Sequence, residues 1–393
     1  YYTIKNLPSL KINDKTISDV IQISEGVYTP LTGFMCIKEI ESVLSNNKLL
    51  TDDSWTLPIV LQITQKDAAK LPGKGEIILI DSKNGERVGV LDIQSVEKFN
   101  SGNFIKSWFG TEDKNHPGVK EIINNGNYIV SGTTFLFNSY RQQTKMHHEY
   151  SPKQTREIFY HNGWYNIVGF HTRNIPHTGH EHIQIKALEI SNADAILLSP
   201  VTGIKKTGDF SSDVIIACYQ KLITKEIYKP KGALLSGFNT YSRYAGPREA
   251  IFTAICRKNF GCNSFIIGRD HTGVGDFYLP NASQKIFDRI DLDMNILLFE
   301  TVSYCTKRNI VTEDLGLALD FASPRCWVAG SSTAYDLTNN GNNATVNGSP
   351  ATQDAGTASQ NIYFDGSNDY LQIAANESSL SFKPGQTICM WVY

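Results

Sequence analysis

The chain has 393 residues, too many for one ordinary domain, so two or three domains are expected. Hydrophobic residues make up 41% of it and charged residues 19%, which is typical of a globular protein with enough apolar material for several cores. The net charge of -2 argues against a nucleic-acid partner, and no apolar run reaches the ~18 residues of a membrane span. Any anion-binding site must therefore be local.

The chain ends and the cysteines predict the compartment. The sequence opens at Tyr1 without methionine or an apolar leader and stops at Tyr393 inside an expected strand, which predicts a fragment without a signal peptide. Seven scattered cysteines without a CxxC pair argue against a disulfide framework or a structural zinc site. We therefore expect a reducing, cytoplasmic location.

The first part of the chain, residues 1–150, is expected to be a small β-rich domain. Short apolar runs separated by Gly and Pro predict strands at Ile59–Ile63, Glu76–Ile80 and Val88–Ile93. A short helix is expected at Ile37–Leu44.

From residue 151 to residue 315 the pattern changes to strands that alternate with helices. Strands separated by helices of this length indicate βαβ units and a Rossmann-like parallel sheet, so the predicted fold class is α/β. The predicted strands are Tyr165–His171, Ala195–Ser199, Gly232–Ser236 and Ser264–Gly268, and the predicted helices are Glu181–Ile190, Ser212–Ile227 and Pro247–Asn259.

The composition shifts again near the C-terminal end. Residues 316–330 are expected to be a linker, and residues 331–393 are rich in Ser, Thr, Asn and Gly at first. Alternating strands are expected at Asn361–Phe364, Tyr370–Ile373 and Thr387–Val392. This pattern predicts the start of an all-β sandwich that is too short to close its own sheets.

Two segments carry the chemistry, Thr172–His180 (TRNIPHTGH) and Gly268–Asp276 (GRDHTGVGD). Each follows an apolar run, so each lies at the carboxyl end of a predicted strand, where open α/β sheets bind ligands. The first segment also leads into a helix, whose N-terminus favours anions through its backbone N–H groups and its dipole. Together they predict a site for a nucleoside triphosphate.

Two histidines and two arginines are the main candidates within these segments. His177 and His180 lie three residues apart at the helix start, where imidazole N–H groups can stabilise charge on phosphate oxygens. Arg173 and Arg269 each follow a strand, and as a pair they can hold a tetrahedral dianion. A surface role is the alternative for each residue, and zinc ligation is a weaker one because no third ligand has a suitable spacing.

Other residues give weaker signals. The glycines of the second segment allow backbone to approach a ligand, and Asp270 either orients His271 or caps a turn. Lys205 and Lys206 either reach phosphates or belong to a solvated basic loop, and Arg243 or Arg248 is expected to add positive potential to the same edge.

These segments, together with three others in order, resemble the ATP sulfurylase (sulfate adenylyltransferase) family of the HxGH nucleotidylyltransferase superfamily. The others are Gly26–Met35 (GVYTPLTGFM), Gly163–Trp164 and Arg243–Ala250 (RYAGPREA), so the resemblance covers roughly residues 1–310. It implies a PUA-like domain before the parallel-sheet domain. It also implies adenylyl transfer from MgATP to sulfate, with Mg²⁺ carried by ATP rather than by a dedicated protein site.

The resemblance also assigns roles. Thr172, Arg173 and Asn174 would form the catalytic trio, with Arg173 on sulfate and Asn174 on the α- and β-phosphates. His177 and His180 would stabilise the pyrophosphate leaving group. Sulfate would attack the α-phosphorus in line, so catalysis would consist of positioning and charge stabilisation.

The second segment and two departures complete the implied site. The implied ATP contacts are Gly268, Arg269, Asp270 and His271. Thr272, where the family usually has Ala, would hold sulfate through its backbone N–H. His171 stands where the family commonly has Gln at a position that touches sulfate, so it is the departure expected to alter oxyanion affinity or its pH dependence.

Three matters stay open at this stage. The activity could be directed at another oxyanion, or the chain could be a non-catalytic binding protein. Asp365–Leu371 resembles the opening of a laminin-G-like domain, through which the C-terminal region would contact a glycan or a surface. A homo-oligomer is also left open.

Overall fold

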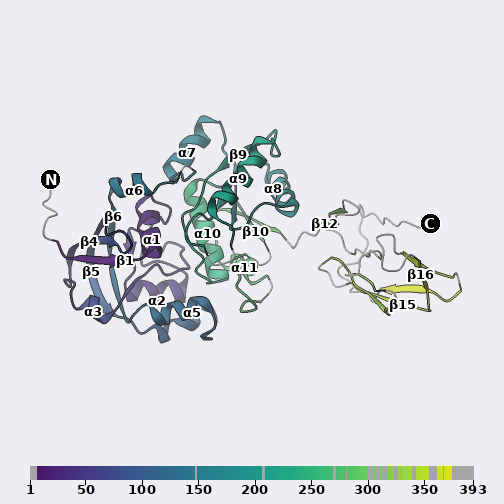
Figure 1. Cartoon of the computed structure of the whole chain (residues 1–393), viewed down its shortest axis with the longest axis horizontal. Coiled ribbons are helices and arrows are strands. Elements are labelled where there is room, and N and C mark those ends of the chain that lie inside the picture. The colour runs from purple at the N-terminus through teal and green to yellow at the C-terminus, as the bar shows by residue number, and fades with distance from the viewer. Residues whose placement is uncertain are drawn as a thin grey trace. The chain divides into compact units, whose positions relative to one another are not determined.

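The structure, a computed structural model, describes residues 7–146, 148–205, 209–268, 271–279 and 281–299. Beyond these it describes 304–305, 310–311, 317, 319, 321, 326–328, 330–338, 342–353, 361–365 and 367–373. The chain divides into two compact units, Tyr1–Phe299 and Glu300–Tyr393 (Figure 1). The predicted arginine and aspartate at positions 269 and 270 lie outside the described residues.

The first unit begins with a domain built on a mixed sheet, called the first domain below. The strand order of this sheet is β1-β4-β5-β6-β2, with β3 paired to β6. Its strands are β1 (Ser9–Ile12), β2 (Gly33–Phe34), β3 (Leu61–Ile63), β4 (Gly75–Asp81), β5 (Arg87–Lys98) and β6 (Tyr128–Leu136). The three strands predicted in this region are confirmed as β3, β4 and β5, with shifted ends.

Helices cover this sheet more fully than the sequence predicts. They are α1 (Asp14–Ser24), α2 (Ile37–Asn46), α3 (Gln65–Ala68), η2 (Ser101–Asn103), α4 (Ile105–Phe109), α5 (Pro117–Asn124) and α6 (Asn138–Thr144). Only α2 was predicted. Helix α1 begins after Asn13, whose side chain accepts a hydrogen bond from the Thr16 backbone N–H at 3.0 Å, and it buries Val20 and Ile21.

The second sheet of this unit is wholly parallel, in the order β11-β10-β7-β8-β9, which confirms the predicted α/β fold class. Its strands are β7 (Ile167–Thr172), β8 (Ala195–Pro200), β9 (Gly232–Leu235), β10 (Ser264–Gly268) and β11 (Asn295–Phe299). Its helices are α7 (Pro152–His161), α8 (Thr178–Ile190), α9 (Ser212–Thr224), α10 (Pro247–Phe260), α11 (Ala282–Lys285) and η3 (Ile286–Arg289). The four predicted strands and three predicted helices are all present.

Alternate residues of the parallel strands enter two different apolar clusters. Val168 and Ile196 belong to the cluster that includes residues of α8 and α9, whereas Ile167 and Leu197 belong to the cluster that continues into the first domain. Both faces of the sheet are therefore covered, which explains why β8 is buried along its whole length.

Helix α10 lies between this sheet and the first domain. Every residue from Glu249 to Arg257 is buried, and Phe252 forms ring contacts with Tyr28 and Trp55 of the first domain. A helix buried on all sides carries apolar residues around its whole circumference, as α10 does at Ala250, Ile251 and Phe252.

The order of the strands sets the position of the site. The chain runs from β7 outward to β8 and β9, and it then returns to the other side of β7 as β10 and β11. The carboxyl ends of β7 and β10 therefore meet at a topological switch point, the place where ligands bind in open α/β sheets.

The second unit contains small antiparallel sheets. Strands β12 (Tyr304–Cys305) and β13 (Ile310–Val311) pair with each other, as do β16 (Ala351–Gln353) and β17 (Asn361–Tyr363). A third sheet joins β14 (Thr333–Ala334), β15 (Ala344–Asn347) and β18 (Tyr370–Ile373). Two predicted strands are thus confirmed as β17 and β18, the strand predicted at 387–392 lies outside the described residues, and the laminin-G-like assignment stays a prediction.

In the part of the chain that the structure describes, no helix is long and apolar enough to cross a bilayer.

Candidate functional site

A cleft of about 330 Å³ opens where β7 and β10 end. It is lined by residues from both predicted segments, namely His171, Thr172, Arg173, Asn174, His180, Gly268, His271 and Thr272. Segments about a hundred residues apart in the sequence therefore meet at the switch point of the sheet.

The end of β7 presents a cation to the cleft. Thr172 is buried, and its hydroxyl oxygen accepts a hydrogen bond from the Asn174 backbone N–H at 3.1 Å, which turns the chain out of the strand. Arg173 follows Thr172, and among the described residues no ion pair or hydrogen bond holds its guanidinium. Arg173 can therefore direct its donors to an oxyanion.

The two predicted histidines stack at the start of α8. The Nδ1 of His177 accepts a hydrogen bond from the Gly179 backbone N–H at 3.2 Å, which caps the helix. The rings of His177 and His180 are 3.9 Å apart between centroids and inclined by 27°. His180 lines the cleft, whereas His177 is exposed beside it and reaches the site by packing against His180.

The His180 ring is neutral at ordinary pH. Burial, followed by the electrostatic effect of the neighbouring His177 ring, lowers the pKa of His180 to about 4. A neutral imidazole carries one N–H, so His180 can donate one hydrogen bond to a phosphate oxygen without carrying a charge.

The turn after β10 provides the opposite wall. The Nε2 of His271 lies 3.0 Å from the Thr253 hydroxyl oxygen, and burial, followed by the charge of Arg257, lowers the His271 pKa to about 3. Thr272 has a φ of 60°, which is strained for a β-branched residue, and its hydroxyl donates to the Gly246 carbonyl at 2.8 Å. This strained backbone lines the cleft at the position predicted to bind the oxyanion.

A loop that the sequence did not single out as cleft-lining forms the remaining wall. It contributes Thr240, Tyr241, Ser242 and Tyr244, and α10 adds Glu249, Phe252 and Thr253. Burial raises the pKa of Glu249, whose carboxylate accepts the backbone N–H groups of Arg243 and Ala245 at 3.0 and 3.1 Å. Glu249 therefore holds the loop by its backbone.

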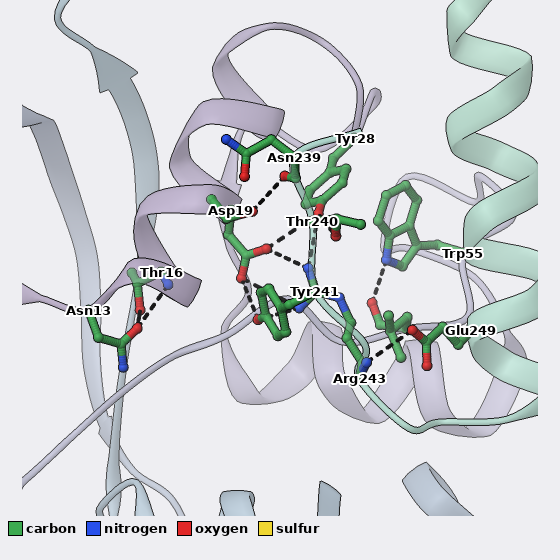
Figure 2. Close-up of polar contacts among 12 residues, drawn as sticks. Asn13, Thr16, Asp19, Tyr28, Trp55, Asn239, Thr240, Tyr241, Arg243 and Glu249 are labelled. Carbon is green, nitrogen blue, oxygen red and sulfur yellow. Dashed lines mark hydrogen bonds and ion pairs between the residues drawn. The ribbon is translucent and has the colours of Figure 1, made fainter. Parts of the chain in front are cut away.

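The first domain anchors the same loop through a buried ion pair. Figure 2 shows Asp19 of α1 directed at Tyr241 and Arg243. The Arg243 Nη2 donates to Asp19 Oδ1 at 2.5 Å and the Tyr241 hydroxyl donates to Asp19 Oδ2 at 3.0 Å. The side chains of Asp19 and Arg243 are only 4% and 9% exposed, so dissolved ions screen the attraction between their charges much less than they would at the surface.

Two arginines expected to add positive charge to the cleft instead join the domains, so that expectation is wrong for both. Arg243 forms an ion pair with Asp19, and neither Arg243 nor Arg248 lines the cleft. Arg248 donates to the carbonyl oxygens of Leu44, at 2.6 Å, and of Ser107, at 2.9 Å. Lys205 donates to the Val201 carbonyl at 2.5 Å, and position 206 lies outside the described residues.

The chemistry of the cleft suits a polyanion. Its donors are a guanidinium, imidazoles and backbone N–H groups at a helix start, all of which bind phosphate or sulfate oxygens. Within the described ranges no three His, Cys, Asp or Glu side chains are grouped to hold a metal ion.

Comparison with protein families assigns the two sheets of the first unit to two different domains. Residues 147–320 match the ATP-sulfurylase family, and residues 2–139 match the PUA-like domain.

Individual relatives match over most of their length. A sulfate adenylyltransferase of Synechocystis sp. is 37% identical over 305 residues, which span 77% of this chain and 77% of the relative. A sulfate adenylyltransferase of Pyrococcus abyssi is 40% identical over 304 residues, spanning 76% of this chain and 77% of the relative. The fold is similar to that of a hexameric APS kinase from Thiobacillus denitrificans, with a TM-score of 0.56 and 19% identity over 78% of this chain and 54% of that chain.

The buried ion pair between the domains predicts a stability effect. Asp19→Asn leaves the Arg243 guanidinium buried without its counter-charge, so we expect the free energy of unfolding to fall by about 3 kcal/mol. Urea denaturation followed by tryptophan fluorescence measures this change. Asp52→Asn is the matched control: its Asp52–Lys48 pair is exposed, and we expect a loss below about 0.5 kcal/mol. Equal effects of the two substitutions would contradict the assignment.

The depressed histidine pKa values predict loss of stability in acid. His180 and His271 bind protons more weakly in the folded chain than in the unfolded chain, where the histidine pKa is about 6.5. The free energy of unfolding should therefore be fully retained above about pH 6.5 and should decline as the pH falls toward about 4.

Denaturation at pH 7.5 and at pH 5.0 measures this decline. His271→Gln should reduce the difference between the two pH values, whereas His161→Gln, at an exposed histidine, should leave it as in the parent chain. If His271→Gln shows the same difference in free energy of unfolding between the two pH values as the parent chain, the His271 imidazole does not contribute to the loss of stability in acid.

Proposed function

The chain belongs to the ATP-sulfurylase family, and on that premise we propose that its cleft transfers the adenylyl group of ATP to sulfate. A sulfate oxygen attacks the α-phosphorus while the bond from that phosphorus to the β-phosphate oxygen breaks. The products are adenosine 5′-phosphosulfate and pyrophosphate. The observation that carries the proposal is the meeting of Thr172–His180 with the end of β10 in one cleft at the switch point.

The described geometry supports distinct roles for the residues. Arg173, with no described partner, holds the sulfate dianion and sets it in line with the α-phosphorus. Asn174 lies beside it and orients the α- and β-phosphates. Thr172 shapes this turn through its hydrogen bond to the Asn174 backbone.

The stacked histidines are proposed to receive the leaving group. Negative charge grows on the β-phosphate oxygen as pyrophosphate departs, at the N-terminus of α8. The neutral His180 ring donates an N–H there, and His177 extends the donor surface outward. On the other wall Gly268 and His271, with Arg269 and Asp270 between them in the sequence, are proposed to contact ATP, and the Thr272 backbone N–H is proposed to contact sulfate.

Further parts of the proposal concern the surroundings of the reaction. Mg²⁺ enters as part of the substrate MgATP and neutralises phosphate charge there. We propose a cytoplasmic location, where ATP is available. A homo-oligomer and a glycan or surface contact through the C-terminal region remain predictions.

Substitution of the two best-placed donors tests the site. Arg173→Ala and His180→Ala should each lower pyrophosphate release from ATP and sulfate at least about 100-fold, because each removes a donor aimed at developing or bound negative charge. The exposed residues Arg87 and His161 provide matched alanine controls that should keep the parent rate. Thermal unfolding of all four variants checks that the fold is retained. A near-parental rate in either site variant would remove the proposed site.

His171, in place of the glutamine common in the family, favours one alternative, transfer to a different oxyanion. Pyrophosphate release measured with sulfate, selenate, molybdate and phosphate separates the two activities. We expect the highest kcat/KM with sulfate. A higher value with another anion would support the alternative, and no release with any anion would support a non-catalytic binding protein.

A further inference from the structure

A buried arginine that the mechanism does not use lies behind the oxyanion side of the cleft. Arg257 is on α10, has no exposed surface, and is not among the residues that line the cleft. Its Cζ lies 4.6 Å from the centre of the Phe238 ring and 6.0 Å from that of Phe265. Its guanidinium is therefore in a largely apolar environment.

The charge of Arg257 is left without an acidic partner. Among the described residues no carboxylate forms an ion pair with it, and its Nε and Nη1 have no hydrogen-bond partner. Burial lowers the pKa of Arg257 to about 10, so the group still carries its charge at neutral pH. An uncompensated buried charge is costly unless a ligand balances it.

The backbone makes room for this side chain. A Cβ added at Gly169 on β7 would lie 3.2 Å from both Cβ and Cγ of Arg257. Gly169 and His171 are two residues apart on one strand, so they face the same side of the sheet. The arginine stem crosses β7 at Gly169 and brings its guanidinium to His171.

The contact between Arg257 and His171 fixes where the imidazole carries its proton. Arg257 Nη2 lies 2.5 Å from His171 Nδ1 and 3.3 Å from the Ser199 carbonyl oxygen. A guanidinium can only donate, so Nδ1 must accept and the ring proton must be on Nε2. His171 lines the cleft and is half-buried, and no hydrogen bond to its Nε2 is found among the described residues.

We propose that Arg257 is a positioning residue of the oxyanion site, which holds His171 as the Nε2–H tautomer so that a neutral imidazole N–H faces the sulfate dianion with a positive charge behind it. The inference rests on the proposed function for the identity of the anion. It assigns Arg257 to the sulfate side of the cleft rather than to the phosphates of ATP.

The charges around His171 agree with a neutral ring. Burial, and then Arg257, hold the His171 pKa well below its usual value, with smaller contributions of the same sign from His271, Arg173 and Lys205. Every one of these neighbours opposes protonation. His171 therefore remains a neutral donor over the whole range in which ATP and sulfate are fully ionised.

The first test observes the tautomer without turnover. Nitrogen-15 NMR of the histidine side chains, assigned with His171→Gln, should show His171 as the neutral Nε2–H form at about pH 6.5, where a free histidine is half protonated, and its signals should shift on titration with sodium sulfate. In Arg257→Met the ring should become protonated at a higher pH and should sample both tautomers. An Nδ1–H or a charged ring in the parent chain at pH 7 would overturn the inference.

The second test separates the sulfate site from the ATP site by kinetics. Arg257→Met should raise the KM for sulfate at least about tenfold, as expected for a weakened hydrogen bond to a charged group, and should change the KM for MgATP less than about twofold. Arg257→Lys, which keeps the charge, should recover part of the loss. In a His171→Gln background the effect of Arg257→Met should shrink, because an amide has no tautomer to fix. Equal changes in both KM values, or none, would overturn the proposal.

Control variants distinguish failure of the Arg257 proposal from failure of the proposed function. Arg87→Met, at an exposed arginine of the first domain, should behave as the parent chain, and thermal unfolding shows whether Arg257→Met folds. If Arg257→Met does not fold, the KM for sulfate of Arg257→Lys and the His171 tautomer of the parent chain test the proposal instead. A parent chain that binds sulfate at His171 but releases no pyrophosphate would reject the proposed function and leave the positioning role standing.

Discussion

Burial of helix α10 between the parallel sheet and the first domain is the constraint on which the cleft depends. The helix buries apolar residues around its circumference, and three of its buried polar residues, Glu249, Thr253 and Arg257, recur every four positions. This spacing places them on one stripe of the helix, since residues four apart lie one above the other. Each has its partner in a different wall of the cleft, so a single rigid helix holds all three walls.

The partners along this stripe show how the walls are held. Glu249 receives two backbone N–H groups of the loop before the helix, and Thr253 lies against His271. Arg257 contacts His171 at the end of β7. Because buried polar groups must find partners, each of these contacts resists displacement of its wall. The first domain contributes through Asp19, which fixes the same loop from its other side.

The sequence predicted the elements that carry the chemistry because their signals are local. Strands β7 and β10 are short apolar runs that end at polar turns, and the His177 and His180 pair marks the start of α8. The cleft also depends on contacts that no local pattern contains. Asp19 and Arg243 are 224 positions apart, and the sequence around Arg243 gives no sign that a helix of the first domain supplies its partner. The same reasoning explains why Arg243 and Arg248 were wrongly expected in the cleft.

The histidines illustrate a second limit of sequence reasoning. An imidazole near a phosphate site is readily pictured as a cation, yet burial keeps His180 and His271 neutral. Among the described residues, positive charge at this cleft comes from Arg173, which lines it, and from Arg257 and Lys205 near His171, whereas the buried His180 ring is a neutral N–H donor. Only the folded environment, with its buried arginine and apolar rings, makes that division of roles visible.

This division bears on His171, which stands where the resemblance to the ATP sulfurylase family implies a glutamine. A glutamine amide offers a neutral N–H donor, and an imidazole offers an equivalent donor only when its proton is on the nitrogen that faces the ligand. Free in solution, a neutral imidazole exchanges between two tautomers, and a protonated one would add a charge to the site. A buried guanidinium that donates to Nδ1 disfavours both the Nδ1–H tautomer and the protonated ring. On the proposed assignment, His171 with Arg257 behind it supplies a neutral donor at the oxyanion position.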